Sequence, residues 1–363
     1  MTPSAASAPV AGVPSGVAAS APDAARAQQQ LPRVRGRLLP AQIGLVINTS
    51  DPYSVQVGEY YQKQRKLSER QVLRVSFPAK PVLSAAEFEK LQADLRAKLG
   101  LEIQGLALAW SKPYAVECNS ITSALALGFQ RELCEASCSP SKPSPYFNYW
   151  GHRPAQDLGL RPSMLLAAPT VEGAKALIDR GLASDSSLAG QFAGNVNVYL
   201  ETTSDAARSV RSSLFPEHGA RLRRMTVQRV IAQNPPGLEQ MPRTLIYLTG
   251  ATHVAGLNKI DWLPGALADH LTSAGGVLDA NTAAGEQMSA LAWIEAGATA
   301  SHGTVSEPCN HLQKFPHPQV LMVSYVQGAT ALETYWRSVA WPAQSVFVGD
   351  PLAAPFAPTP APF

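Results

Sequence analysis

The sequence predicts an α/β protein whose sheet is mostly parallel and is covered by helices on both faces. Two observations favour this class. Apolar runs of strand length, such as 43–47 and 244–248, are continuous rather than alternating, which is typical of strands buried on both faces. Most of these runs are followed by a helical pattern, as expected when parallel strands are joined by helical crossovers. The chain has 363 residues, of which 45% are apolar, so it can bury a sizeable core.

The elements follow one another along the chain in a strand–helix order. The predicted strands are 43–47, 71–77, 106–110, 163–168, 195–200, 244–248, 299–301 and 346–348. The predicted helices are 54–65, 84–99, 119–129, 171–180, 204–211, 266–273 and 286–295. The second helix has the clearest start, because Ser84 is followed three residues later by Glu87 in the pattern of a capping box.

Composition divides the chain into a tail and a folded region. Residues 1–40 are rich in Ala, Pro and Ser and are expected to be disordered, because such a segment buries too little apolar surface to offset its ordering entropy. Residues 41–356 form the α/β region, either as one large domain or as two lobes of about 41–215 and 216–356. Residues 1–30 lack the basic and apolar regions of a signal peptide.

Charge and motif content exclude several classes of function. Charged residues make up 16% of the chain, the formal net charge is +3, and the basic residues form no long run, which argues against binding to nucleic acid. No apolar stretch approaches the ~20 residues that a transmembrane helix needs. Neither a GxGxxG nor a P-loop motif is present, so no nucleotide or other cofactor is predicted.

Polar residues that directly follow the predicted strands are the candidates for a ligand site, because ligands of open α/β sheets bind at the carboxyl ends of strands. Asn48, Asp51 and Ser54 follow the first strand and Asp350 follows the last. The same residue types are also standard in strand-to-helix turns and tight turns, which is the competing interpretation.

Four further residues are candidates for catalysis. His253 follows the strand 244–248, where a general base would be placed, and Asp279 follows the short apolar run 276–278. Glu307 is held in an extended conformation by Pro308, and we expect it to be partly buried and paired. Cys309 has imidazoles nearby in the sequence and is a candidate thiolate nucleophile, although an ordinary structured loop is the alternative.

The cysteines predict a disulfide more readily than a metal site. Cys134 and Cys138 flank a loop and suit a bridge, but Cys118 is an equally acceptable partner for either of them. Reduced structural thiols are the alternative. A second cysteine pair with metal-ligand spacing is absent, so no metal site is predicted.

Three groups of residues resemble an uncharacterised bacterial family found in species that carry exosortase, a protein-sorting system of exopolysaccharide producers. They are Asn48 to Ser54 with Tyr60, Tyr61 and Arg65; 297–298 with 303–308; and 349–356. The resemblance covers roughly residues 40–356. It implies an exported, periplasmic protein but no particular activity.

Residues 244–352 also resemble, more faintly, the end of the gingipain-type cysteine peptidases, which implies a caspase-like rather than a flavodoxin-like fold. In that family the catalytic His and Cys end the two strands before a Gly-Ala strand, here 297–298 onward. His253 matches the first position, but the second offers Asp279 and Cys309 lies beyond the Gly-Ala strand.

Two functions therefore follow as hypotheses. The first is a hydrolase or transferase that uses His253, Asp279, Glu307 and Asp51. The second is a non-catalytic module that binds a protein or glycan partner through exposed aromatic residues of one long loop, namely Tyr146, Phe147, Tyr149 and Trp150.

Overall fold

The computed structural model describes residues 33–232, 241–279 and 287–358, which belong to one compact unit. Most of the predicted tail 1–40 therefore lies outside the described residues, but 33–40 do not follow the prediction of disorder. The amide of Val34 donates to Gln327 Oε1 at 2.9 Å, and the side chain of Leu38 is buried. Within the described ranges, no helix is long and apolar enough to cross a membrane.

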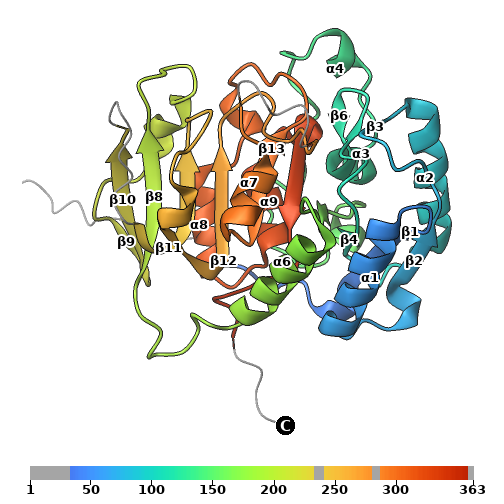
Figure 1. The fold of residues 1–363 in the computed structure, drawn as a ribbon, viewed down its shortest axis with the longest axis horizontal. Coiled ribbons are helices and arrows are strands. Elements are labelled where there is room, and N and C mark those ends of the chain that lie inside the picture. Colours follow the sequence, from blue (N-terminus) through green and yellow to red (C-terminus); the bar gives the residue numbers. More distant parts are fainter. Residues whose placement is uncertain (1–32, 233–240, 280–286, 359–363) are drawn as a thin grey trace, which may run out of the picture. The chain divides into compact units, whose positions relative to one another are not determined.

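An eleven-stranded sheet runs through this unit in the order β2-β1-β4-β7-β14-β13-β12-β11-β8-β10-β9 (Figure 1). The first group of strands is β1 (Ile43–Asn48), β2 (Val72–Val75), β4 (Gly105–Leu108) and β7 (Ser163–Leu165). The second group is β8 (Val196–Thr202), β9 (Arg221–Leu222), β10 (Met225–Ile231), β11 (Met241–Thr249), β12 (Ile260–His270), β13 (Ala300–Thr304) and β14 (Ser345–Gly349).

Pairing in the sheet is mostly parallel, which confirms the predicted fold class. The four strands of the first group pair in parallel, and so do β10, β8, β11, β12 and β13. The short β9 pairs antiparallel with β10, and β14 pairs antiparallel with β13. Val348 of β14 pairs with Leu165 of β7, and this pair joins the two groups into one sheet.

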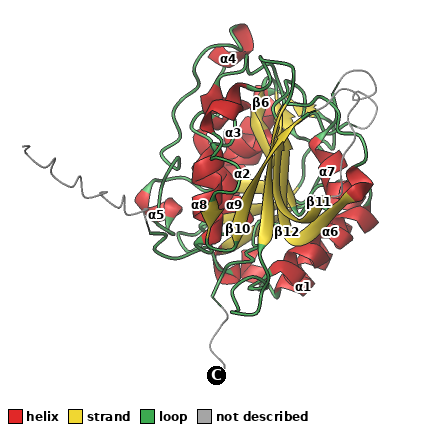
Figure 2. Ribbon diagram, turned by 90° about the vertical axis from the view of Figure 1, so that its left-hand side faces the viewer, coloured by secondary structure: helices red, strands yellow, loops and turns green. Residues whose placement is uncertain are grey.

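Helices cover both faces of the sheet, as Figure 2 shows. One face carries α1 (Pro52–Arg65), α6 (Val171–Ser184) and α7 (Ala290–Ala296). The other carries α3 (Ile121–Leu127), α8 (Pro318–Val326) and α9 (Ala331–Ser338). The remaining helices are α2 (Ala85–Lys98), α4 (Glu132–Glu135) and α5 (Pro154–Asp157), and a small sheet is formed by β3 (Val82–Leu83), β5 (Ala115–Val116) and β6 (Asn119–Ser120).

Two predicted helices are wrong. The segment 266–273 lies mostly in β12, which is hydrogen-bonded between β11 and β13. The segment 204–211 contains turns and then a 3-10 helix, Val210–Leu214, rather than an α-helix. The predicted capping box of α2 is confirmed, because the Ser84 side chain accepts a hydrogen bond from the Glu87 amide. The predicted helix 286–295 begins outside the described residues, and the observed helix there is α7.

Candidate functional site

A cleft of about 330 Å³ opens where the chain leaves three neighbouring strands, β1, β4 and β7. Residues that follow β12 close its other side. The lining residues are Asp51, Tyr53, Ala79, Ser111, Lys112, Ala168, Pro169, Leu278, Asp279 and Leu291. The cleft therefore gathers two of the predicted site residues, Asp51 and Asp279, although 228 positions separate them in the sequence by the difference of their numbers.

The first turn of α1 fixes one wall of the cleft. Asp51 is the N-cap residue, and its Oδ1 accepts a hydrogen bond from the Tyr53 amide at 3.0 Å. The Tyr53 hydroxyl donates to the Leu166 carbonyl at 3.1 Å and accepts from the Ala168 amide at 2.9 Å. Burial raises the pKa of Tyr53 to about 12, so the phenol stays neutral and holds the wall in place.

An ion pair crosses the cleft. Lys112 follows β4 and its Nζ lies 3.2 Å from Asp279 Oδ1, with the Asp279 side chain about one-fifth exposed at 19%. Ser111 beside it donates its hydroxyl to the Ala168 carbonyl at 3.0 Å. Because Lys112 follows β4 and Asp279 follows β12, this ion pair connects segments that leave the two groups of strands.

The other predicted ligand-binding residues do not line the cleft. The buried Asn48 side chain donates to the Phe77 carbonyl at 3.0 Å, and Ser54 Oγ accepts from the Asn48 amide at 2.8 Å. These contacts match the alternative interpretation, a strand-to-helix turn. Asp350 is fully buried and pairs with Arg65 of α1, and its Oδ1 accepts from the Tyr61 hydroxyl at 3.1 Å.

The loop after β13 does not have the predicted chemistry. Cys309 is bonded to Cys138, so its sulfur is not a thiolate in this structure. Glu307 is exposed rather than partly buried; its side chain accepts a hydrogen bond from the Cys309 amide at 2.7 Å and interacts electrostatically with Lys314. The second bridge, Cys118–Cys134, is one of the alternatives left open by the sequence.

His253 lies on the exposed loop after β11, and within the described ranges it makes no hydrogen bond. The histidine that ends β12 is instead His270, which is fully buried. Its Nδ1 accepts from the Trp293 indole at 2.9 Å, and its Nε2 donates to the Met288 carbonyl at 2.7 Å. Burial lowers the pKa of His270 to about 4, so this ring is a neutral, fully bonded structural group.

A second buried histidine faces an ion pair inside the sheet. His302 of β13 is in register with Asp269 of β12, and Arg211 Nη1 lies 2.6 Å from Asp269 Oδ1. Neither ring nitrogen of His302 has a hydrogen-bond partner among the described residues, and the ring lies among Phe315, Tyr335 and Phe347. Burial, together with the positive charge of Arg211, holds the pKa of His302 well below its usual range.

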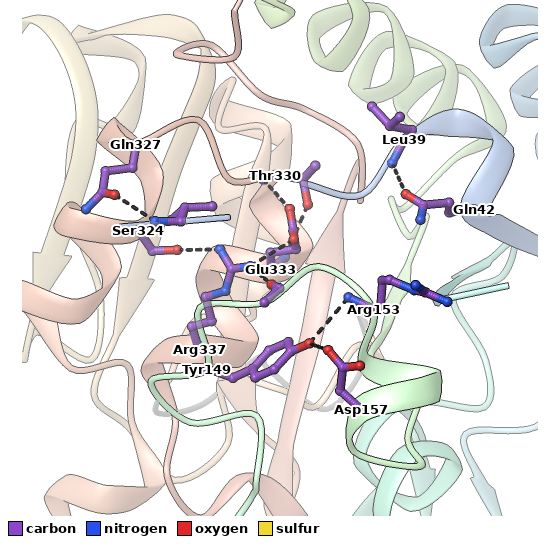
Figure 3. Close-up of polar contacts among 12 residues, drawn as sticks. Leu39, Gln42, Tyr149, Arg153, Asp157, Ser324, Gln327, Thr330, Glu333 and Arg337 are labelled. Carbon is purple, nitrogen blue, oxygen red and sulfur yellow. Dashed lines mark hydrogen bonds and ion pairs between the residues drawn. The ribbon is translucent and has the colours of Figure 1, made fainter. Parts of the chain in front are cut away.

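The aromatic loop proposed as a partner surface is largely packed against the protein. Tyr146 is fully buried, with its ring 6.3 Å from that of Trp336. Figure 3 shows the adjacent network, in which Arg337 bonds to Glu333 and Ser324 and the Tyr149 hydroxyl bonds to Asp157. Arg337 also donates to the Gly151 carbonyl at 2.8 Å, which holds this loop on α9.

Lys112, Ser111 and Tyr53 line the cleft but were not among the predicted site residues. The position of Ser111 and Lys112 immediately after a predicted strand marks them as candidates in the sequence, but no motif there singles them out. Asp269, His270 and Arg211 had no such signal, because their segments were interpreted as helices.

Comparison with known proteins supports the fold and nothing finer. No protein-family model matches the chain, and no curated protein shows significant sequence similarity. The chain is similar to the crystal structure of the Arg-specific cysteine proteinase gingipain R (RgpB), with a TM-score of 0.50 and 10% identity over 89% of this chain and 80% of that chain. It also matches a complex of the Porphyromonas gingivalis RgpB pro- and mature domains, with a TM-score of 0.39 and 12% identity over 88% of this chain and 80% of that chain. The protein therefore has the caspase-like α/β fold found in gingipain R.

Proposed function

We propose that this chain is an exported binding protein, built on a caspase-like scaffold, that does not act as a cysteine peptidase and that takes its ligand in the cleft between Asp51 and Asp279. The observation that carries the proposal is the state of the cysteines. The sequence has four, and all four are in disulfides, so the folded chain offers no thiolate nucleophile.

The strand ends support the same proposal. The resemblance to gingipain-type peptidases places a catalytic cysteine at the end of the strand before the Gly-Ala strand. That strand is β12, and it ends at His270, whose two ring nitrogens are already bonded to Trp293 and Met288. A ring with no free nitrogen and a depressed pKa cannot act as the general base for a neighbouring group.

The two disulfides support export, because such bonds persist in oxidising compartments such as the periplasm and are rare in the cytosol. The proposal also includes a role in species that carry exosortase. That part of the proposal rests on the sequence resemblance alone, and it agrees with export. The cleft supplies the binding site, since it combines convergent polar groups with the apolar side chains of Leu278 and Leu291.

Hydrolysis is the second candidate, favoured by the two carboxylates on the cleft. Asp51 and Asp279 line the same space, and a pair of carboxylates is what most glycoside hydrolases use for catalysis. Neither His253 nor Glu307 is among the described residues that line the cleft, so this alternative depends on the two carboxylates.

Turnover assays on the purified full chain distinguish these functions. The oxidised protein is incubated with a fluorogenic peptide library and with nitrophenyl glycosides, with and without dithiothreitol, and its thiols are counted by alkylation under denaturing conditions. We expect no free thiol and no turnover. Peptide cleavage that is abolished by Cys309→Ala, but not by the matched control Cys118→Ala, would overturn the proposal. Glycoside cleavage abolished by Asp279→Asn would establish the hydrolase.

A further inference from the structure

The polar groups on the cleft mostly accept hydrogen bonds. Asp51 uses Oδ1 to cap α1, while none of the described residues engages its Oδ2. The Ser111 hydroxyl donates its hydrogen bond to the Ala168 carbonyl, so its oxygen is left to accept a hydrogen bond from a ligand. The Tyr53 hydroxyl already donates and accepts within the protein. Among the described residues that line the cleft, Lys112 is the one whose side chain offers N–H groups to a ligand.

The charges on the cleft disfavour an acidic ligand. The described part of its lining contains two carboxylates, Asp51 and Asp279, and one ammonium, Lys112. Lys112 is moreover paired with Asp279 at 3.2 Å, so an incoming carboxylate or phosphate would have to displace that pair and face Asp51 as well. Like charges brought together in a partly desolvated space repel one another.

The remaining surface of the cleft is apolar and small. Leu278 and Leu291 are buried residues that line it, and Ala168 and Pro169, which follow β7, add further apolar surface. A volume of about 330 Å³ lies at the lower end of the range of ligand pockets, roughly 300–1,000 Å³. The space suits a compact ligand with an apolar face and with hydroxyl or amino groups around its edge.

We infer that the cleft binds a hydroxyl-rich, non-acidic saccharide unit, which donates hydrogen bonds to Asp51 and Ser111, accepts one from Lys112 and lays its C–H face on Leu278 and Leu291. This inference rests on the proposed binding function and names the chemistry of its ligand. Neutral sugars and amino sugars both carry donor groups that can bond to a carboxylate such as that of Asp51. The positive charge of the amino sugar distinguishes the two classes experimentally.

The test is saturation-transfer NMR, followed by titration, on the full-length oxidised chain. The probes are neutral disaccharides of glucose, galactose and mannose, their 2-amino counterparts, and oligogalacturonate as the acidic comparison. Asp51→Asn keeps a good helix cap but loses the charge, and Ala79→Trp narrows the mouth at an exposed position. Glu59→Gln is the matched control, since it removes an exposed carboxylate from the same helix, outside the cleft.

We expect at least one neutral or amino probe to bind, and oligogalacturonate to bind more weakly. Asp51→Asn should weaken binding by about tenfold to a hundredfold, the usual effect of losing a charge-assisted hydrogen bond. Ala79→Trp should abolish it, and Glu59→Gln should leave it unchanged. Salt-sensitive binding restricted to the amino probes would identify an amino sugar, and salt-insensitive binding a neutral one.

Preferred binding of oligogalacturonate, binding that survives both cleft variants, or binding of none of the probes would each overturn the inference. These failures are separable from failure of the proposed function. That function is rejected by thiol-dependent or glycosidic turnover, whereas a chain without turnover and without saccharide binding would retain the binding role and lose only this ligand class.

Discussion

His302 is a buried polar side chain in apolar, aromatic surroundings. A neutral imidazole carries one N–H donor and one acceptor, and neither finds a partner among the aromatic rings around it. An unsatisfied buried polar group costs roughly 1–3 kcal/mol of folding free energy. Since Asp269 and Arg211 are also fully buried beside it, the ring cannot be charged without adding a second cation next to Arg211.

This environment predicts a loss of stability in acid. An unfolded histidine has a pKa of about 6.5, whereas burial depresses the pKa of His302 well below that and that of His270 to about 4. The unfolded chain therefore binds more protons below about pH 6.5, so the free energy of unfolding falls as the pH drops through this window. Each ring contributes a slope of up to about 1.4 kcal/mol per pH unit.

His302→Phe should remove one of these contributions. Urea unfolding gives the difference in the free energy of unfolding between the variant and the parent. We expect this difference to shift in favour of the variant by about 2 kcal/mol when the pH is lowered from 7.5 to 5. The parent chain, unfolded at the same two pH values, is the reference. An unaltered pH slope in His302→Phe would mean that the ring is already protonated, or hydrated, in the folded state.

At the scale of elements, the sequence identifies those that carry their own local signal. The continuous apolar strands β1 and β11 and the capped helix α2 were predicted, because local residue types specify them. The pattern at 266–273 instead favours a helix, and pairing of β12 with both β11 and β13 overrides this local preference. Every residue of α9 is buried, including Glu333 and Arg337, whose charges pair with each other inside the fold and whose burial the sequence does not indicate.

The candidate site was predictable only in part, because it depends on contacts between segments that are distant in the sequence. Asp51 and Asp279 stand at strand ends and could be selected from sequence, but their meeting across one cleft depends on how β4 and β12 are ordered in the sheet. The roles of Glu307 and Cys309 could not be decided, since the bonding of Cys309 to Cys138 depends on contacts between distant loops.

The start of α9 is held by an ion pair that should matter for stability. Glu333 caps the helix through Thr330 and pairs with Arg337 at 2.9 Å, and both side chains are fully buried. Glu333→Gln preserves the capping pattern but leaves Arg337 as an uncompensated buried charge, so we expect a loss of about 3–5 kcal/mol in the free energy of unfolding.

Chemical denaturation of a matched exposed pair provides the comparison. Glu69→Gln removes the partner of Arg74, and both of these side chains are solvated, so a change below about 1 kcal/mol is expected. Equal effects of the two substitutions would show that Arg337 finds other compensation, such as the Gly151 carbonyl, to which it already donates.

Across the whole molecule, the two disulfides join three segments on one side of the fold. Cys118–Cys134 ties α4 to the small sheet and has a sequence separation of 16, whereas Cys138–Cys309 ties the following loop to the loop after β13 and has a separation of 171. Lys314 reinforces the second link, because its buried Nζ donates to the Ser137 carbonyl at 2.6 Å.

The two bridges should differ in their effect on stability. A crosslink that closes a longer loop removes more entropy from the unfolded chain, by about 5 kcal/mol for the long bridge against about 3 kcal/mol for the short one. We therefore expect the Cys138→Ser/Cys309→Ser variant to lose more stability than Cys118→Ser/Cys134→Ser, as measured by guanidinium unfolding of the oxidised proteins. The reverse order would show that strain or residual structure, rather than loop length, sets these values.

The long bridge also determines what limited proteolysis can release. Lys259 is exposed in the loop between β11 and β12, and this position lies inside the span closed by Cys138 and Cys309. A trypsin cut there produces two polypeptides that remain covalently joined, each still contributing strands to the same sheet. Such a nicked protein would migrate as one band without reductant and as two bands with it, so the crosslink would preserve the assembly after the backbone has been broken.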